Sequence, residues 1–434
     1  MDKIKILFER LFLRSPNINV CFRILIKGNI DKKKVDTALD NVCKRHPLLN
    51  CSIEIDNEYN AWFIPNSCSP GVEYYSSEEM ADWQVWYRKI ENLPFDLLKG
   101  PLARICVIWG NDQMEIIVKG HHVIGDGTSY LNLSKDILLA LDEKLETTPQ
   151  IPPAIKFEKN IKPNILQKMY IKKLNKECRK NRVLFSEKEY LSFFREYRNT
   201  SILGLYLNSI DENNLRKIKE KCKKNKLTVT EIITSAFAIA LSSGNELGIG
   251  IAVSMRNELT AKPYFCMGNF VTGIVTKINL NPKNDFMTNV NKTTKLLRKL
   301  LGNTKKRHSG FSLLAEFDND LMESIMYAAY GNYQLSISKK IRGLIAKGLD
   351  ENGFCISNLG NNELNNYEKF NLLDMQFIAP LFPITLLTIS IITVNNKLNI
   401  CIRYNENKLK TESVIKIYNT AIDLLCNNNE KDIK

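Results

Sequence analysis

The strongest constraint on the fold of this 434-residue chain is that strand-like and helix-like segments alternate in two successive runs. A proline-rich stretch, ETTPQIPPAIKF, separates the two runs, and its three prolines interrupt regular structure. Two halves of comparable content predict an α+β protein, an α/β sandwich built from two similar domains, residues 1–165 and 166–434. A functional site is expected in the crevice between such domains.

The N-terminal run begins with an expected strand at residues 18–27. An amphipathic helix over residues 31–47 follows, with Asp31 placed as its N-cap. Two hairpins come next, and the second, ARICVIWG and MEIIVKGHH joined by NDQ, ends at a pair of histidines. A strong helix over residues 128–145 follows that pair, so the histidines lie where a buried strand ends.

The C-terminal run begins near residue 201 and repeats the alternation of strands and helices. Thr228 and Glu231 have the spacing of a capping box at the start of a buried helix. Asn395-Asn396 marks the turn of a late hairpin. The segment NTKKRHSG, residues 303–310, is expected to be a solvated loop, and it is a candidate for contacting the phosphates of a ligand.

Nothing in the hydropathy predicts a membrane-spanning segment, because no stretch approaches the roughly 20 apolar residues that a span needs. Residues 1–15 carry charges through their apolar part, which is typical of an amphipathic opening helix and not of a signal peptide. The basic segment 164–182 favours a solvated connecting helix, with a helix resting on a membrane surface as the alternative. We therefore expect a cytoplasmic protein without membrane association.

The net charge of +14 has two interpretations: a basic surface of no special function, which is favoured, or an anionic partner. Nucleic acid is not the expected partner, because basic residues do not interleave with aromatic ones and no zinc-finger or RNA-recognition signature appears. Eleven scattered cysteines without a CxxC pair predict free thiols and exclude a disulfide framework or a cysteine zinc site.

The stretch HHVIGDG, residues 121–127, is the most specific motif in the chain. Neighbouring side chains on a strand point to opposite faces, so His121 and His122 cannot easily share a metal ion, and no metal site is expected. A neutral imidazole that faces a cavity can accept a proton near neutral pH. Glycine permits a sharp turn after the strand, and the following helix directs free N–H groups to the loop. For an isolated histidine a structural role would be the better interpretation, and the whole pattern favours catalysis.

HHVIGDG resembles the HHxxxDG signature of the chloramphenicol acetyltransferase-like superfamily. Condensation domains of non-ribosomal peptide synthesis, alcohol acetyltransferases, polyketide-associated acyltransferases and the plant BAHD enzymes belong to that group. KRHPLLN, VSMRNE followed by MGNFV, and ISNLG resemble further segments of the superfamily in the expected order. The resemblance covers residues 15–425, and the absence of a DFGWG-like motif argues against the BAHD branch.

The resemblance implies roles for individual residues. His122 matches the catalytic histidine, His121 the supporting one, and Gly127 the glycine that closes the motif. Asp126 matches an aspartate that faces away from the substrate and holds the loop, with Arg256 as its salt-bridge partner. A tunnel between two chloramphenicol acetyltransferase-like domains of one chain is the implied active site, which suggests a monomer. The expected oxyanion or substrate contacts are Ser357, Asn358 and the backbone near Gly127.

The implied function is acyl transfer from an acyl thioester to an alcohol or amine, with His122 as general base and no bound cofactor. Acyl-CoA is the favoured donor, and an alcohol acceptor suits a free-standing alcohol acetyltransferase-like enzyme. A stand-alone condensation enzyme that takes thioesters from a carrier protein and forms an amide is the first alternative. A non-catalytic binding member of the fold is the second, and the intact HHxxxDG motif argues against it.

Overall fold

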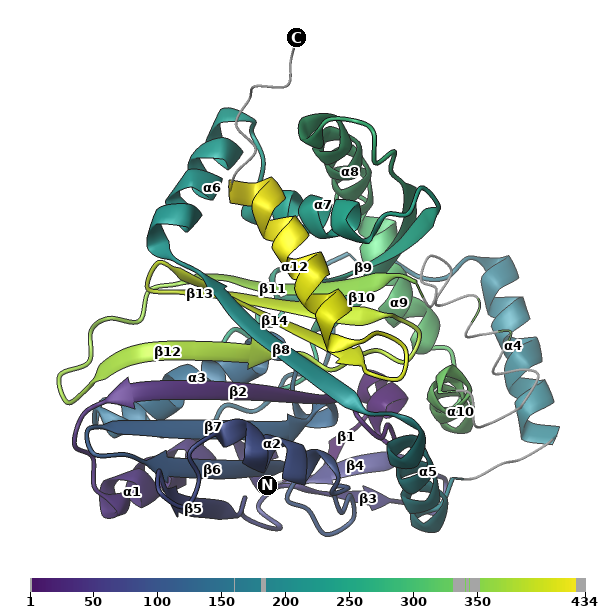
Figure 1. The fold of residues 1–434 in the computed structure, drawn as a ribbon. Helices are drawn as coiled ribbons and strands as arrows, with labels where there is room; N and C mark the ends of the chain where they lie inside the picture. The colour runs from purple at the N-terminus through teal and green to yellow at the C-terminus, as the bar shows by residue number, and fades with distance from the viewer. Residues whose placement is uncertain are drawn as a thin grey trace.

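The computed structural model describes residues 2–159, 161–180, 185–330, 340, 343 and 352–426. The described residues form three sheets, and the two larger ones lie one above the other with helices on their outer sides (Figure 1). None of the described helices is long and apolar enough to cross a membrane. All eleven cysteines are free thiols, as the sequence predicts.

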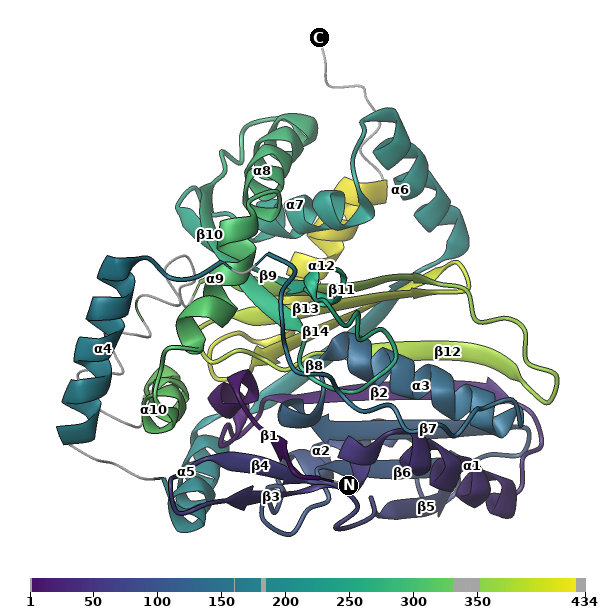
Figure 2. The ribbon, with the colours of Figure 1, turned by 180° about the vertical axis from the view of Figure 1, so that it is seen from behind.

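The N-terminal half is built around a five-stranded sheet with the order β12-β2-β7-β6-β5. Its first four strands pair antiparallel, and β5 pairs parallel with β6. Helices α1 and α3 pack together over one face, as Figure 2 shows from behind, and α2 covers the other. The elements of this half are β1 (Ile4–Lys5), η1 (Phe8–Phe12), β2 (Asn19–Lys27), α1 (Lys32–Arg45), η2 (Pro47–Asn50), β3 (Ser52–Ile55), β4 (Ala61–Ile64), β5 (Val72–Ser76), α2 (Trp83–Glu91), β6 (Ala103–Trp109), β7 (Gln113–His121), η3 (His122–Ile124) and α3 (Gly127–Leu141).

The C-terminal half is built around a six-stranded mixed sheet with the order β10-β9-β11-β13-β14-β8. Helices α6, α7, α8 and α12 bury one core against its outer face (Figure 1). The described elements are α4 (Ile165–Lys180), α5 (Glu187–Thr200), β8 (Leu203–Ile210), α6 (Glu212–Lys224), α7 (Val229–Leu241), β9 (Glu246–Ser254), η4 (Arg256–Glu258), β10 (Val271–Asn279), α8 (Phe286–Leu301), α9 (Thr304–Leu314), α10 (Asn319–Ala329), β11 (Phe354–Asn362), β12 (Asn371–Ile378), β13 (Leu387–Val394), β14 (Lys397–Asn405) and α12 (Thr411–Cys426).

Strand β12 crosses from the second half of the sequence into the N-terminal sheet, where it pairs antiparallel with β2. The two halves are therefore joined by a shared strand as well as by the connecting chain. A buried ion pair also joins Arg403 of β14 to Glu91 of α2, since Nη2 of Arg403 donates to both carboxylate oxygens at 2.8 and 2.9 Å. The domain boundary at residue 165 stays a prediction. Residues 371–378 lie beyond it in the sequence, but they form a strand of the N-terminal sheet.

Several local elements differ from the sequence predictions. The expected opening helix is the short strand β1 and the 3-10 helix η1, because Ile4 and Lys5 pair with β4 instead of continuing a helical turn. The expected loop NTKKRHSG belongs to α9, whose N-cap Asn303 accepts a hydrogen bond from the backbone N–H of Lys306. The stretch between the two predicted hairpins contains β5 and α2, for which no element was predicted, and β12 was not predicted either.

Helix α4 has two different faces. One face packs through Leu174 and Cys178 against Leu321 and Ile325 of α10. The other exposes 77% of Ile165, 78% of Leu166 and 65% of Met169. A connecting helix is thus present where the sequence predicts one, and the membrane-surface interpretation stays an untested alternative.

Candidate active site

The order of strand, turn and helix that the motif predicts is present at residues 121–127. Strand β7 ends when His121 pairs with Asn19 of β2, and the backbone N–H of His122 donates to the carbonyl oxygen of Ile18 at 3.0 Å. The chain then makes the short 3-10 turn η3 and enters α3 at Gly127, with Asp126 as its N-cap. The motif therefore fixes a tight loop between a buried strand and a buried helix.

His121 points away from the cavity described below, and its ring is hydrogen-bonded within the loop. Its Nδ1 accepts a hydrogen bond from the backbone N–H of Val123 at 3.1 Å, so its proton is carried by Nε2. The ring is fully buried and lies edge-on to Phe95, with 5.7 Å between the ring centroids. Burial, together with the neighbouring His122 and Lys119, lowers the pKa of His121 to about 3. His121 is thus a neutral structural residue at physiological pH.

His122 lies on the opposite side and lines the main apolar cavity. Only 6% of the residue is exposed, and its ring contacts Phe12 of η1 with 4.9 Å between centroids. Nδ1 is fully enclosed, which leaves Nε2 as the nitrogen that can reach a substrate. Burial lowers the pKa of His122 below its ordinary value, although Asp126, the residue's own backbone and Asn269 oppose that shift. The imidazole is therefore neutral at pH 7.

The 3-10 helix η1 is held in place beside His122 by buried charges. Arg10 and Arg14 both pair with Glu323 of α10, and all three side chains are almost completely buried. Tyr59 donates to the same carboxylate at 2.9 Å. A buried charge that lost its partner would be strongly destabilising, so this cluster fixes Phe12 against the histidine.

Asp126 and Arg256 form the ion pair that joins the motif to the second half of the chain. The two guanidinium Nη atoms donate to the two carboxylate oxygens, each at 2.9 Å. Asp126 also accepts from the backbone N–H groups of Ser129 and Phe270, each at 2.9 Å. Burial alone would raise the pKa of Asp126. Arg256 and these hydrogen bonds outweigh that effect and hold the pKa below its ordinary value. The carboxylate stays ionised and faces the protein instead of the cavity.

Asn269 is a site residue that was not predicted from the sequence. Its Nδ2 donates to the carbonyl oxygen of His122 and, at 3.3 Å, to that of Val123. It therefore clamps the backbone of η3 from the second half of the chain. The signal for it was present in the quoted segment MGNFV, because an asparagine next to glycine before a strand can bind backbone groups.

The cavity beside His122 has a volume of about 270 Å³ and is lined by both halves of the chain. Most of its described lining is apolar. The N-terminal half contributes Phe8, Leu11, Phe12, Val20, His122 and Gly127. The remainder comes from β9, β10, α9, α10, β11 and the segment from β12 to β13, with polar groups at Asn269, Thr272, Ser357 and Thr388.

Ser357 and Asn358, the two predicted oxyanion contacts, differ in position. Ser357 lines the cavity. Asn358 does not: its side chain donates to Thr230 at 3.0 Å and accepts from the backbone N–H of Gly360 at 2.8 Å. Of the two predicted contacts, only Ser357 belongs to the described lining of the cavity.

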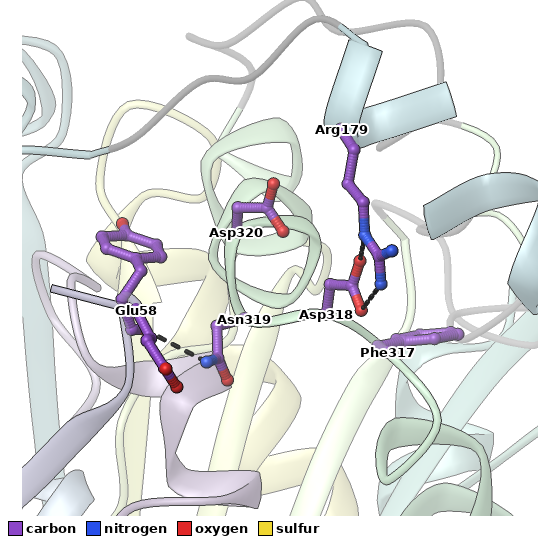
Figure 3. A pocket seen from close by; sticks show the side chains of 7 residues that line it. Glu58, Arg179, Phe317, Asp318, Asn319 and Asp320 are labelled. Atoms are coloured by element: carbon purple, nitrogen blue, oxygen red, sulfur yellow. Dashed lines mark hydrogen bonds and ion pairs between the residues drawn. The ribbon is translucent and has the colours of Figure 1, made fainter. Parts of the chain in front are cut away.

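A second hollow of about 470 Å³ lies between α4, α10 and the β3–β4 turn, and Figure 3 shows the side chains that line it. Its Asp318 is occupied by Arg179, whose guanidinium donates to both carboxylate oxygens at 2.6 and 2.9 Å. The hollow contains none of the residues that the sequence predicts for the site. Among the described residues, no cluster of three or more histidine, cysteine, aspartate or glutamate side chains could hold a metal ion.

Most of the chain resembles a known protein family in sequence. Residues 6–317 match the family described as Condensation domain. A plipastatin synthase protein of Bacillus subtilis (strain 168) is 21% identical over 303 residues, which make up 64% of this chain and 11% of that protein. Bacitracin synthase 2 of Bacillus licheniformis is 24% identical over 274 residues, or 56% of this chain and 9% of that protein. The chain thus spans about a tenth of the length of these relatives.

Two solved structures share the fold over nearly their whole length. Trichothecene 15-O-acetyltransferase TRI3 from Fusarium sporotrichioides has a TM-score of 0.67 at 11% identity, covering 98% of this chain and 95% of that one. The condensation domain of the monacolin K polyketide synthase MokA has a TM-score of 0.62 at 11% identity, with 98% and 97% covered. They confirm the predicted fold of two chloramphenicol acetyltransferase-like domains in one chain.

The close packing around Gly127 generates a prediction. A Cβ atom at this position would lie 2.9 Å from Cζ of Phe377 and 3.3 Å from Cδ2 of Leu359. Gly127→Ala should therefore destabilise the protein by about 1–3 kcal/mol, as overpacking does. Chemical unfolding measures the change. Gly71→Ala is the matched control, because a Cβ there meets nothing within 4 Å, and it should stay within about 0.5 kcal/mol of the parent. Equal effects of the two variants would contradict the tight packing of the motif.

Proposed function

This chain belongs to the condensation-domain family, and on that premise we propose that it transfers an acyl group from an acyl thioester to an alcohol or amine. The observation that carries the proposal is a neutral, buried His122 whose Nε2 can reach an apolar cavity between the two halves of the chain. A neutral imidazole in that position can accept a proton from a bound hydroxyl or amine. The apolar wall can hold an acyl group while it excludes water.

In the proposed reaction, Nε2 of His122 removes the proton of the acceptor as the acceptor's oxygen or nitrogen attacks the thioester carbonyl carbon. A tetrahedral intermediate forms with a negative charge on the former carbonyl oxygen. Its collapse breaks the carbon–sulfur bond, and the imidazolium returns the proton to the leaving thiolate. Holding both reactants beside one base supplies proximity, which is worth several kcal/mol in well-oriented systems.

Two groups are candidates for stabilising the oxyanion. They are the side chain of Ser357, which lines the cavity, and the backbone N–H of Gly127, the first residue of α3, which also lines it. The positive end of a helix favours a developing negative charge. Asn358 is left out of this role because its amide is engaged by Thr230 and Gly360.

Acyl-CoA is the donor that we favour. Helix α9 supports this choice, since Gly310, Phe311 and Leu314 line the cavity while Lys305 and Lys306 are exposed on its first turn. Those two lysines could bind CoA phosphates near the mouth of the cavity. The remaining basic residue of the segment, Arg307, is occupied by Glu258 at 2.8 Å.

A carrier-protein thioester is the second candidate donor, with an amide as the product. The observation that favours it is the similarity to the plipastatin and bacitracin synthases. A monomeric state and a cytoplasmic location complete the proposal as predictions.

Thiol release tests the proposed reaction. Acyl-CoA thioesters are mixed with panels of alcohols and amines, and the released thiol is measured for the parent, His122→Ala and His122→Gln. Loss of the general base should lower acceptor-dependent release by about 10²–10⁴-fold. His46→Gln is the matched control, because His46 is equally buried but hydrogen-bonded to Asp136 at 2.8 Å, away from the cavity.

The outcomes of this assay are distinct. Equal release by the parent and both His122 variants would show that His122 is not the base. Release that requires a phosphopantetheinylated carrier in place of CoA would favour the second donor. A parent that transfers from neither kind of thioester would leave the non-catalytic alternative and overturn the proposal.

The pH profile of kcat/KM should reflect the lowered pKa of His122. The active form is the neutral imidazole, and burial holds its pKa below the ordinary value of 6.5. The rate should therefore stay constant from pH 8 down past 6.5 and fall only when the pH passes through the lowered pKa. A fall that is half complete at or above pH 6.5 would contradict a desolvated histidine base.

A further inference from the structure

The described lining of the cavity beside His122 contains no aspartate, glutamate, lysine or arginine. Its ionisable groups in the described part of the chain are His122 and Cys355. Burial raises the pKa of the Cys355 thiol to about 12, so the thiol is uncharged. A substrate group inside this cavity therefore meets apolar atoms and a few neutral dipoles.

Asp126, Arg256 and Glu9 lie near the cavity but are not part of its described lining. Asp126 and Arg256 neutralise each other in a bidentate pair. Glu9 lies on η1 between the lining residues Phe8 and Phe12, but it is not itself part of the lining. Its carboxylate accepts from the backbone N–H of Leu7 at 3.1 Å, and burial raises its pKa to about 7. A cationic substrate would find no free carboxylate among the described lining residues.

An ammonium group placed in such a cavity would lose its water and gain no counter-ion from the described lining. Burial of an unpaired charge is among the most costly steps in protein recognition. A hydrocarbon group gains from the same transfer. We therefore expect the described lining to favour hydrocarbon acyl groups over aminoacyl groups, although peptide synthetases are among the relatives by sequence.

Gly273 leaves a gap in one wall of this cavity. It lies on β10 between Val271 and Val275, which share its face of the strand, and all three line the cavity. A Cβ atom built at Gly273 would meet no other atom within 4 Å. Gly273 is itself exposed, so the wall is open at this point, and the missing side chain leaves room for part of a ligand.

From these observations, and resting on the proposed acyl transfer, we propose that the donor carries an uncharged hydrocarbon acyl chain that extends along β10 past Gly273, and that aminoacyl donors are excluded. The acyl chain displaces water from the apolar wall, and its carbonyl carbon lies beside Nε2 of His122. The acceptor then approaches from outside the acyl compartment.

Matched thioesters test the exclusion of charge. Octanoyl-CoA and 8-aminooctanoyl-CoA differ by one ammonium group, and hexanoyl-CoA and 2-aminohexanoyl-CoA differ in the same way beside the carbonyl. The proposal predicts that kcat/KM falls by about a hundredfold or more for each amino compound. Comparable rates would overturn it, and Glu9→Gln would then show whether Glu9 is the counter-ion.

The Gly273 variant tests the path of the chain. Gly273→Leu should lower the ratio of kcat/KM for octanoyl-CoA to kcat/KM for acetyl-CoA about tenfold or more, because the added side chain occupies space that only the longer chain needs. Gly71→Leu, in the open surroundings outside the cavity, is the control and should change neither rate. A profile that shifts with acceptor size, and not with acyl length, would contradict the assignment of the cavity to the acyl group.

Binding measurements distinguish a failure of this inference from a failure of the proposed reaction. Calorimetry with non-hydrolysable ketone analogues, in which a methylene group replaces the thioester sulfur, needs no turnover. Tight binding of the octyl analogue, with weakened binding in Gly273→Leu, would support the acyl compartment even if no acceptor were found. His122-dependent transfer without any preference for hydrocarbon over amino analogues would preserve the proposed reaction and overturn the inference.

Discussion

The ion pair between Asp126 and Arg256 is the contact on which the geometry of the site depends. It connects the N-cap of α3 in the first half of the chain to η4 in the second, and both side chains are almost fully buried. The same carboxylate accepts two backbone N–H groups, so fixed donors surround it on several sides. The pair is costly to break, because either charge left alone would be buried without a partner.

Because of this pairing, the second half of the chain holds the loop in place, while His122 lines the cavity. Asn269 holds the backbone of η3, and the buried cluster around Glu323 holds η1 and Phe12 against the ring. Enclosure lowers the pKa of His122 and keeps it neutral. The same desolvation that keeps the imidazole neutral also makes the adjacent cavity suitable for the uncharged acyl group that we propose.

The features that the sequence predicted best are those set by local rules. HHVIGDG was placed correctly at the end of a strand and the start of a helix, since strand alternation and an aspartate N-cap act over a few residues. The capping box of Thr228 and Glu231 is present for the same reason. The partnership of Asp126 with Arg256 spans 130 residues and came from the family resemblance, not from spacing.

The features that were missed depend on distant contacts. Strand β12 is stabilised by pairing with β2, and no pattern within residues 371–378 reveals that partner. Asn269 contacts the motif only because the two halves of the chain meet there. Asn358 lies outside the cavity lining, and its amide is bound by Thr230.

A double-mutant cycle tests most directly whether the buried pair supports the site. Asp126→Asn, Arg256→Met and the double variant are compared with the exposed pair Lys3–Glu54, by chemical unfolding and by the rate of thiol release. We expect a loss of about 3–5 kcal/mol for each single variant, a double variant that loses far less than their sum, and parallel losses of rate. Additive losses, or single losses no larger than the roughly 0–1 kcal/mol expected for the exposed pair, would contradict the central role of this ion pair.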